Sequence, residues 1–255
     1  MNRLNSASIF IAIAIALVFP NLTHAQITQG QIDTFEAATT MGWSIGSVAF
    51  VGPSVQPGGP GGASDHFLQL ISGGTGPPRW VIFNQAQWTG NYNTPAPAGS
   101  NQVNAIEMDI ANFSSTVLAT RIAFKVGAGQ TPGWVFNGGS GTGGAIDVQP
   151  NGVWTHVVFP INDSTMVPIT DPFGSPPPTP LSAMMSAVGE MRILHAPTPS
   201  LNGSVPFTGR IGIDNIHAFF QPVPEPTSIL AAALCVGLVA RPARRWWKGT
   251  SSAAG

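Results

Sequence analysis

The sequence predicts an all-β protein whose central part folds as a two-sheet β-sandwich or a β-barrel. Several short segments alternate apolar and polar residues with a period of two, which is typical of half-buried strands. Glycine-rich and proline-rich stretches separate them, with 30 glycines and 24 prolines among 255 residues. Only one segment has helical spacing, so a fold built on layers of helices is not expected.

The N-terminal residues 1–25 have the pattern of a secretory signal peptide. Arg3 supplies the positive start, residues 9–19 form an apolar core, and small residues lead to a cleavage site between Ala25 and Gln26. The apolar core is too short for a stable membrane span. The alternative interpretation is an N-terminal anchor that is not cleaved.

The C-terminal tail, residues 223–248, has three parts in a fixed order. It begins with the rigid tripeptide Pro224-Glu225-Pro226, in which proline excludes both helix and sheet. An uncharged apolar run of 14 residues follows at 227–240. The last part contains basic residues and two tryptophans: Arg241, Arg244, Arg245, Trp246, Trp247 and Lys248. This order is typical of a helix that leaves a bilayer on its cytoplasmic side; the alternative is a buried C-terminal helix.

The tail closely resembles the PEP-CTERM sorting signal of bacterial exported proteins. The motif Pro224-Glu225-Pro226, the apolar run and the cluster of Arg241, Arg244 and Arg245 carry the resemblance. It implies transient anchoring in the inner membrane by a C-terminal hydrophobic helix, and cleavage near the motif by an exosortase-type processing enzyme. The processed protein is then expected at the cell surface or outside the cell.

The central domain, residues 26–222, contains the expected strands. Alternation is clearest at 106–110, 118–126 and 153–159, and further strands are expected at 32–35, 67–71, 80–83, 191–194 and 210–220. Residues 181–188 are expected to form about two turns of helix, because their apolar residues recur at helical spacing. The stretches expected as turns and loops are 57–62, 73–78, 127–133, 138–144 and 176–180.

The charge and cysteine content of this domain exclude several classes of function. It has five basic and ten acidic residues, a formal charge of −5, and no basic patch, so nucleic acid is not an expected partner. The only cysteine, Cys235, lies in the tail. The domain therefore has no disulfide and no cysteine metal site.

The last expected strand contains a change of phase. Ile211 and Ile213 follow one alternation, whereas Ile216 and Ala218 follow the other. One extra residue, a β-bulge at Asp214-Asn215, would account for this change. The bulge would also redirect the acidic side chain of Asp214.

Short segments of the domain look like galactose-binding-type jelly-roll domains, which occur in many carbohydrate-binding modules. They are Asp33-Thr34-Phe35-Glu36, Trp43, Trp154 and Ile213-Asp214-Asn215-Ile216. The resemblance implies a two-sheet jelly roll and a structural Ca²⁺ ion. Its expected ligands are the side chains of Glu36 and Asp214, with backbone carbonyls near Asp33. Calcium prefers such hard oxygen ligands; the alternative is that these acids are solvated ends of strands.

Aromatic residues in or beside expected loops are the candidates for stacking on sugar rings: Trp80, Trp88, Tyr92 and Trp134. Trp43 and Trp154 are expected to pack in the core instead. The alternative for each candidate is an ordinary core aromatic that buries a large apolar area.

These features lead to the expectation of a non-enzymatic surface or matrix protein that binds extracellular polysaccharide. A second hypothesis is a structural or adhesive protein without a sugar site. A third is a carbohydrate-active hydrolase or lyase using Glu107 and Asp109, whose carboxylates should lie roughly 6–7 Å apart on one strand face, within the range of glycosidase pairs. No catalytic motif accompanies this pair, and the histidines lack metal-binding spacing.

The first prediction concerns processing at both ends. The native secreted protein should start near Gln26 and end near Pro224, because both a cleavage site and a complete three-part tail are present. Intact-mass spectrometry of material purified from the native host measures this directly. A mature chain that retains Trp246 and Trp247 would contradict exosortase-type processing.

Overall fold

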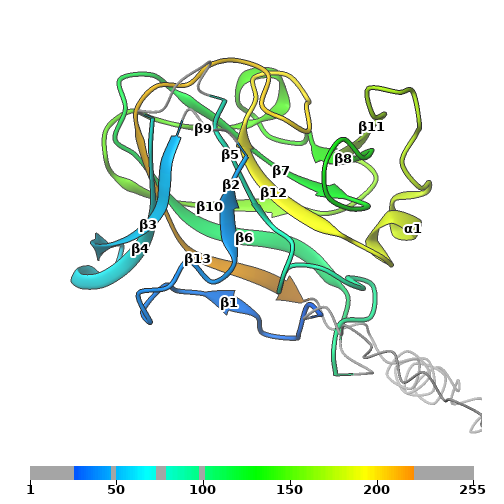
Figure 1. The fold of residues 1–255 in the computed structure, drawn as a ribbon, viewed down its shortest axis with the longest axis horizontal. Coiled ribbons are helices and arrows are strands. Elements are labelled where there is room, and N and C mark those ends of the chain that lie inside the picture. The colour runs from blue at the N-terminus through cyan, green and yellow to red at the C-terminus, as the bar shows by residue number, and fades with distance from the viewer. Residues whose placement is uncertain (1–25, 47–49, 73–78, 98–100, 221–255) are drawn as a thin grey trace, which may run out of the picture.

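The computed structural model describes residues 26–46, 50–72, 79–97 and 101–220. They form two antiparallel sheets that face each other across one core, as a two-sheet β-sandwich of the jelly-roll type (Figure 1). The predicted fold class is confirmed. Within these residues no helix has the length and apolar character to cross a membrane. The predicted signal peptide (1–25) and the sorting tail (223–248) lie outside the described residues.

The six-stranded sheet has the order β10-β6-β13-β4-β3, and β1 pairs with β13. The strands β3 and β4 form a long hairpin that turns between Gly59 and Gly62. The bounds are β1 Ile32–Asp33, β3 Phe50–Gly59, β4 Gly62–Ser72, β6 Val103–Asn112, β10 Trp154–Pro160 and β13 Arg210–Phe220.

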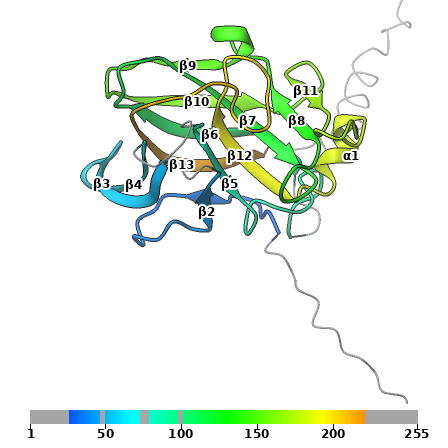
Figure 2. The same cartoon turned by 45° about the horizontal axis from the view of Figure 1, so that its top comes forward.

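The seven-stranded sheet has the order β11-β8-β7-β12-β5-β2, and β9 pairs with β7. Figure 2 shows this sheet opposite β6 and β13. Its strands are β2 Trp43–Ile45, β5 Val81–Asn84, β7 Leu118–Lys125, β8 Gly133–Phe136, β9 Ile146–Val148, β11 Met166–Ile169 and β12 Glu190–His195. Two short helices, η1 Thr142–Gly144 and α1 Leu181–Met185, lie in the connections.

The core lies between the inner faces of the two sheets. Met108 and Ile213 from one sheet and Ile122 from the other are all fully buried. Phe136 of β8 meets Phe159 of β10 edge to face, with ring centroids 5.1 Å apart. Aromatic pairs of this geometry add to the stabilisation from buried area, so this contact helps to hold the two sheets together.

The structure confirms the expected strands and corrects some boundaries. Every expected strand corresponds to an observed one, although β1 is shorter than predicted and α1 ends at Met185. Five strands were missed: β2, β3, β8, β9 and β11. Four of these have only three or four residues, too few to show alternation. The fifth, β3, contains Pro53, Pro57 and several glycines, which indicated a loop in the sequence.

Arg121 is fully buried on the outer face of the seven-stranded sheet. Its guanidinium donates hydrogen bonds to the carbonyl oxygens of Ala196, Phe136 and Gly143, each at 2.6 Å. Burial lowers the pKa of Arg121 to about 10. Because these donors reach carbonyls of separate segments, the side chain ties the connections after β8 and β12 to this face.

A second buried network lies on the same outer face of the seven-stranded sheet. Glu190 lies between Lys125, whose Nζ is 3.4 Å from Glu190 Oε1, and Arg192. Arg192 also donates to the carbonyl oxygen of Leu201 at 2.7 Å, and the Leu201 side chain is buried against a small apolar cluster that includes Leu194. The connection after β12 therefore covers the outer face of the seven-stranded sheet.

His195, at the end of β12, is buried in its neutral form. The Ala119 N–H donates to its Nδ1 at 3.0 Å, and its ring lies 5.0 Å from that of Phe207. Burial lowers the pKa of His195 from 6.5 to about 4. The unfolded chain therefore binds more protons at this residue than the folded chain does between pH 4 and 6.5.

The second prediction follows from the lowered pKa of His195 in the folded domain. The contribution of His195 to the free energy of unfolding is complete above pH 6.5 and is lost as the pH falls toward 4, by about 2 kcal/mol between pH 7 and 5. His195→Gln keeps an uncharged acceptor and removes the titration. Urea unfolding at both pH values should show a smaller acid loss for the variant than for the wild type. Equal losses would contradict a neutral buried His195.

Candidate functional site: the open face of the six-stranded sheet

The outer face of the six-stranded sheet carries partly exposed aromatic and charged side chains, and we call it the open face. Cross-strand pairing aligns its residues in rows: Trp154 is opposite Ala111, which is opposite Gly212. In the next row His156 is opposite Asp109, which is opposite Asp214. Further members are Phe67, Glu107, Phe113, Arg210, Asn215 and His217.

Trp154 lies across this face because the residues beside it are small. A Cβ built on Gly212 would be 2.8 Å from Cη2 of Trp154, although Gly212 lies two strands away. Strands are roughly 4.8 Å apart, so the indole extends over Ala111 on β6. Phe67 and Phe113 meet its ring edge to face, at centroid distances of 5.2 and 6.3 Å. Trp154 remains partly exposed.

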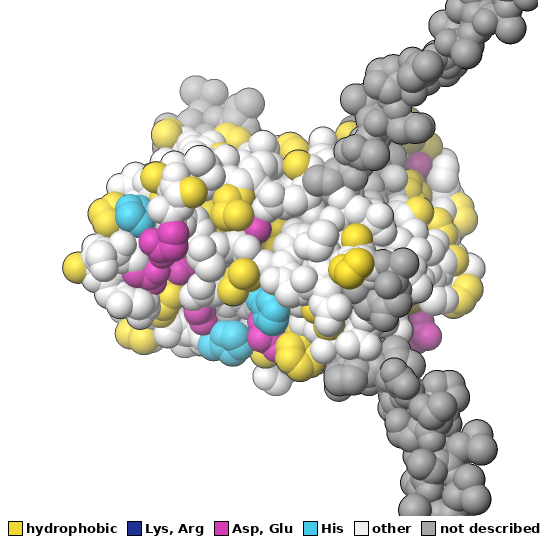
Figure 3. Space-filling view, turned by 90° about the horizontal axis from the view of Figure 1, so that it is seen from below, with side chains coloured by type: hydrophobic (Ala, Val, Ile, Leu, Met, Phe, Trp, Pro, Cys, Tyr) yellow, Lys and Arg dark blue, Asp and Glu magenta, His cyan; other side chains and the backbone are white. Residues whose placement is uncertain are grey.

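Carboxylates and imidazoles alternate beside Trp154. His156 Nδ1 is 3.1 Å from Asp109 Oδ1, and Asn215 Nδ2 donates to Asp109 Oδ2 at 2.8 Å. Glu107 Oε2 is 3.9 Å from His156 Nε2 and 3.7 Å from His217 Nδ1. Figure 3, seen from the side of this sheet, shows acidic side chains and histidines gathered on the face, with no Lys or Arg visible.

The predicted bulge in β13 is confirmed. The register with β6 shifts between Asp214 and His217, and Asn215 has a φ of 51°. Asp214 points to the outer side but is fully buried, and its carboxylate oxygens have no hydrogen-bond partner of normal geometry, although the nearby Asn215 N–H acts to lower its pKa. Burial, with the nearby carboxylates of Asp65, Asp109 and Glu36, raises its pKa to about 7. Burying a carboxylate without a partner lowers the stability of the folded state.

Glu36 and Asp65 lie near Asp214 at the end of the β3–β4 hairpin. A Cβ built on Gly59 would be 2.5 Å from Asp65 Oδ2 and 3.3 Å from Asp214 Oδ2, so these two carboxylates approach one glycine. Glu36 accepts a hydrogen bond from the His66 N–H at 3.2 Å. Hydrogen bonds from Asp65 and His66 lower the pKa of Glu36, whereas burial raises that of Asp65.

As they stand in the part of the chain that the structure describes, no three His, Cys, Asp or Glu side chains form a ready metal site. Of the predicted calcium ligands, Glu36 and Asp214 lie in one region. The Asp33 carboxylate lies elsewhere and is already occupied: it accepts hydrogen bonds from the indoles of Trp43 and Trp88, both at 2.7 Å. Burial raises the pKa of Asp33 to about 6. Asp65 was missed because only the hairpin brings it to Asp214.

The predicted sugar platform is wrong in its residues. Trp80, Trp88 and Tyr92 are fully buried, and Trp134 is 7% exposed, with its Nε1–H bonded to the Pro178 carbonyl. Rings buried in the core cannot stack on a sugar. Trp154, which was expected in the core, lies on the open face instead. The alternation of β10 contained the signal, because it places Trp154 in phase with the polar His156.

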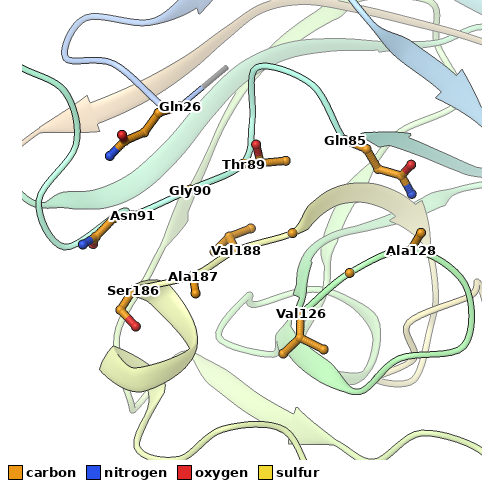
Figure 4. A pocket seen from close by; sticks show the side chains of 12 residues that line it. Gln26, Gln85, Thr89, Gly90, Asn91, Val126, Ala128, Ser186, Ala187 and Val188 are labelled. Carbon is orange, nitrogen blue, oxygen red and sulfur yellow. The ribbon is translucent and has the colours of Figure 1, made fainter. Parts of the chain in front are cut away.

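A separate cavity of about 650 Å³ lies between three loops at one end of the sandwich (Figure 4). Gln26, Gln85 and Asn91 contribute carboxamide side chains, and Val126 and Val188 contribute apolar surface. The lining contains no charged and no aromatic side chain. It therefore lacks the stacking surface that the open face provides.

Comparisons with known proteins found similar solved structures but no matching family model. No protein-family model matches the sequence, and no curated protein matches it. The family 11 carbohydrate-binding module of the cellulosomal cellulase Lic26A-Cel5E of Clostridium thermocellum matches at 14% identity, over 78% of this chain and 98% of that one, with a TM-score of 0.46.

Two further structures are similar to this chain. The Clostridium thermocellum family 11 module in complex with a β-1,3-1,4-mixed-linked tetrasaccharide also matches at 14% identity, over 75% of this chain and 96% of that one, with a TM-score of 0.46. An exo-β-agarase matches at 10% identity, over 78% of this chain, with a TM-score of 0.49. The match spans only 26% of the agarase.

The third prediction tests how Trp154 is positioned. Gly212→Ala should destabilise the domain by about 1–3 kcal/mol, because the added methyl overlaps Trp154 and Phe67. It should also increase acrylamide quenching of Trp154 fluorescence. Gly127→Ala is the matched control, since a Cβ there meets no atom within 4 Å. Equal stability and quenching in the two variants would show that Trp154 does not lie over Gly212.

Proposed function

We propose that this chain is an exported, non-enzymatic protein that binds polysaccharide on the open face, with Trp154 as the stacking surface. The observation that carries the proposal is the partly exposed indole on an uncovered sheet face, beside side chains that form hydrogen bonds. Sugar sites combine an aromatic or apolar surface with a few placed polar groups. Here Asp109, His156 and Asn215 supply acceptors and donors for hydroxyl groups.

The same rows support binding rather than catalysis. Glu107 and Asp109 are each associated with histidine or asparagine side chains. We therefore treat this pair as part of the binding surface. The alternative of an adhesive protein without a sugar site is an outcome of the binding experiment below.

Export and processing remain part of the proposal on the strength of the sequence. The pattern of residues 1–25 supports export, and the PEP-CTERM-like tail supports transient anchoring in the inner membrane. An exosortase-type enzyme would then release the protein to the cell surface or the extracellular matrix. A polysaccharide ligand is consistent with that location.

We also propose a structural Ca²⁺ ion held by Glu36 and Asp214, with Asp65 as a further side-chain ligand. The support is chemical: three hard oxygen donors lie in one region, and the Asp214 carboxylate is buried without a partner. The ion would supply positive charge that relieves repulsion between these carboxylates. It would thereby link the β3–β4 hairpin to β13 and to the segment after β1.

The fourth prediction tests polysaccharide binding. In affinity gel electrophoresis with neutral β-glucans, Trp154→Ala should weaken binding at least tenfold, because loss of an aromatic anchor costs about 2 kcal/mol or more. Val153→Ala, which changes an exposed neighbour just before β10, is the control and should bind normally. Retention of full affinity in Trp154→Ala would overturn the proposed site. No binding by the wild type to any polysaccharide would favour the adhesive alternative.

The fifth prediction tests the calcium ion. At a calcium concentration of 100 Kd, binding stabilises the folded domain by about 2.7 kcal/mol, and each kcal/mol corresponds to roughly 2–4 °C in Tm. EDTA should therefore lower the Tm of the wild type by several degrees and leave that of Asp214→Asn unchanged. In EDTA at pH 8, Asp214→Asn should be at least as stable as the wild type, because it removes an unpaired buried charge. A wild-type Tm that does not respond to EDTA would contradict the site.

A further inference from the structure

We infer that the open face prefers cationic polysaccharides, namely polymers of amino sugars with free amines, over neutral and anionic ones. This inference rests on the proposed polysaccharide-binding function and names its ligand class.

The acidic side chains near the open face greatly outnumber the basic ones. Five of the ten acids of the domain lie on or beside this face: Glu36, Asp65, Glu107, Asp109 and Asp214. Three of the five bases belong to the other sheet, where they are buried: Arg121, Lys125 and Arg192. Even with a Ca²⁺ ion on Glu36, Asp65 and Asp214, the described contacts of Glu107 and Asp109 include no Lys or Arg, so this part of the face keeps a negative potential.

Arg210 is the base that the described strands contribute to the six-stranded sheet, and it lies at the far end of the face. Its guanidinium stacks over the ring of Phe113 at 4.2 Å. Arg210 precedes Gly212 by two residues and Asp214 follows Gly212 by two, so the two charges lie on opposite sides of the row that contains Trp154. The face is thus polarised along its strands.

Glu107 and Asp109 are the acids best placed to meet a ligand stacked on Trp154. Their side chains are 23% and 19% exposed, whereas Asp214 is fully buried. Along the strands, the Asp109 row lies roughly 7 Å from the Trp154 row and the Glu107 row roughly 14 Å away. A polysaccharide that runs along the strands from the stacked sugar would pass both carboxylates.

Neither of these carboxylates is paired with a permanent cation in the described residues. The ionisable partners of Glu107 are His156 and His217, and Asp109 is held by His156 and Asn215. Histidine and asparagine leave the negative charge of the carboxylate in place unless the histidine is protonated. Both acids therefore remain free to accept hydrogen bonds from a cationic ligand.

A protonated amine of an amino sugar matches this surface in two ways. Its N–H groups can donate charge-assisted hydrogen bonds to Glu107 or Asp109, which are stronger than bonds between neutral groups. The cation is also attracted to the face of an indole such as Trp154. A carboxylated or sulfated polysaccharide would instead meet like charge, in a domain whose formal charge is −5.

The test compares two polymers that differ only in their amines: glycol chitosan and the same polymer after complete N-acetylation. Both are titrated against the purified domain by isothermal calorimetry, in low-salt buffer near neutral pH with fixed calcium. The wild type should bind the amine form at least fivefold more tightly, and this preference should shrink as salt is added. Alginate should bind more weakly than either polymer.

Two variants assign the preference to the face. Glu107→Gln should lose most of the preference for the amine form, measured as the ratio of its affinities for the two polymers. Asp163→Asn, which removes one charge from an exposed loop, should keep the preference. Equal affinity of the wild type for both polymers would overturn this inference but leave the proposed function intact. Equal effects of the two variants would also overturn it, and failure of both polymers and of neutral β-glucan to bind would overturn the proposed function.

Discussion

The bulge at Asp214-Asn215 is the constraint on which the six-stranded sheet depends. It allows Ile213 and Ile216 both to face the core, although a regular strand would place them on opposite faces. Because β13 pairs with β6, β4 and β1, its phase sets the register at the centre of the sheet. The same extra residue places Asp214 on the outer side and Asn215 beside Asp109.

The outer faces of the two sheets differ because of what lies on them. On the seven-stranded sheet, Arg121 and Glu190 form buried networks that hold the connecting loops. Leu201 packs there against a small apolar cluster. On the six-stranded sheet, Ala111 and Gly212 leave space that the Trp154 indole occupies without being covered. One face is therefore covered by connecting loops, whereas the other carries a partly exposed aromatic side chain.

Two buried aspartates show how similar burial leads to different roles. Asp33 accepts hydrogen bonds from two indoles and from Gln87, so its carboxylate is satisfied within the core. Asp214 has no side-chain donor of this kind and lies near other carboxylates. Burial raises the pKa of both, to about 6 and about 7. Only Asp214 would gain a missing partner from a bound cation, which is why the calcium proposal rests on it.

The sequence by itself determined the class of fold, most of the strands and the bulge in β13, because these follow from local alternation. The alternation of β10 also indicated the side of Trp154, although the size of the indole led to the expectation that it packs in the core. Only the tertiary structure decided which faces are covered. Trp80, Trp88 and Tyr92 stand beside loops in the sequence, yet the opposite sheet and the loops bury them. Asp65 reaches Asp214 only through a long hairpin. Which side chains are exposed, and which distant side chains meet, depends on contacts between segments far apart in the sequence. A period of two residues cannot specify these contacts.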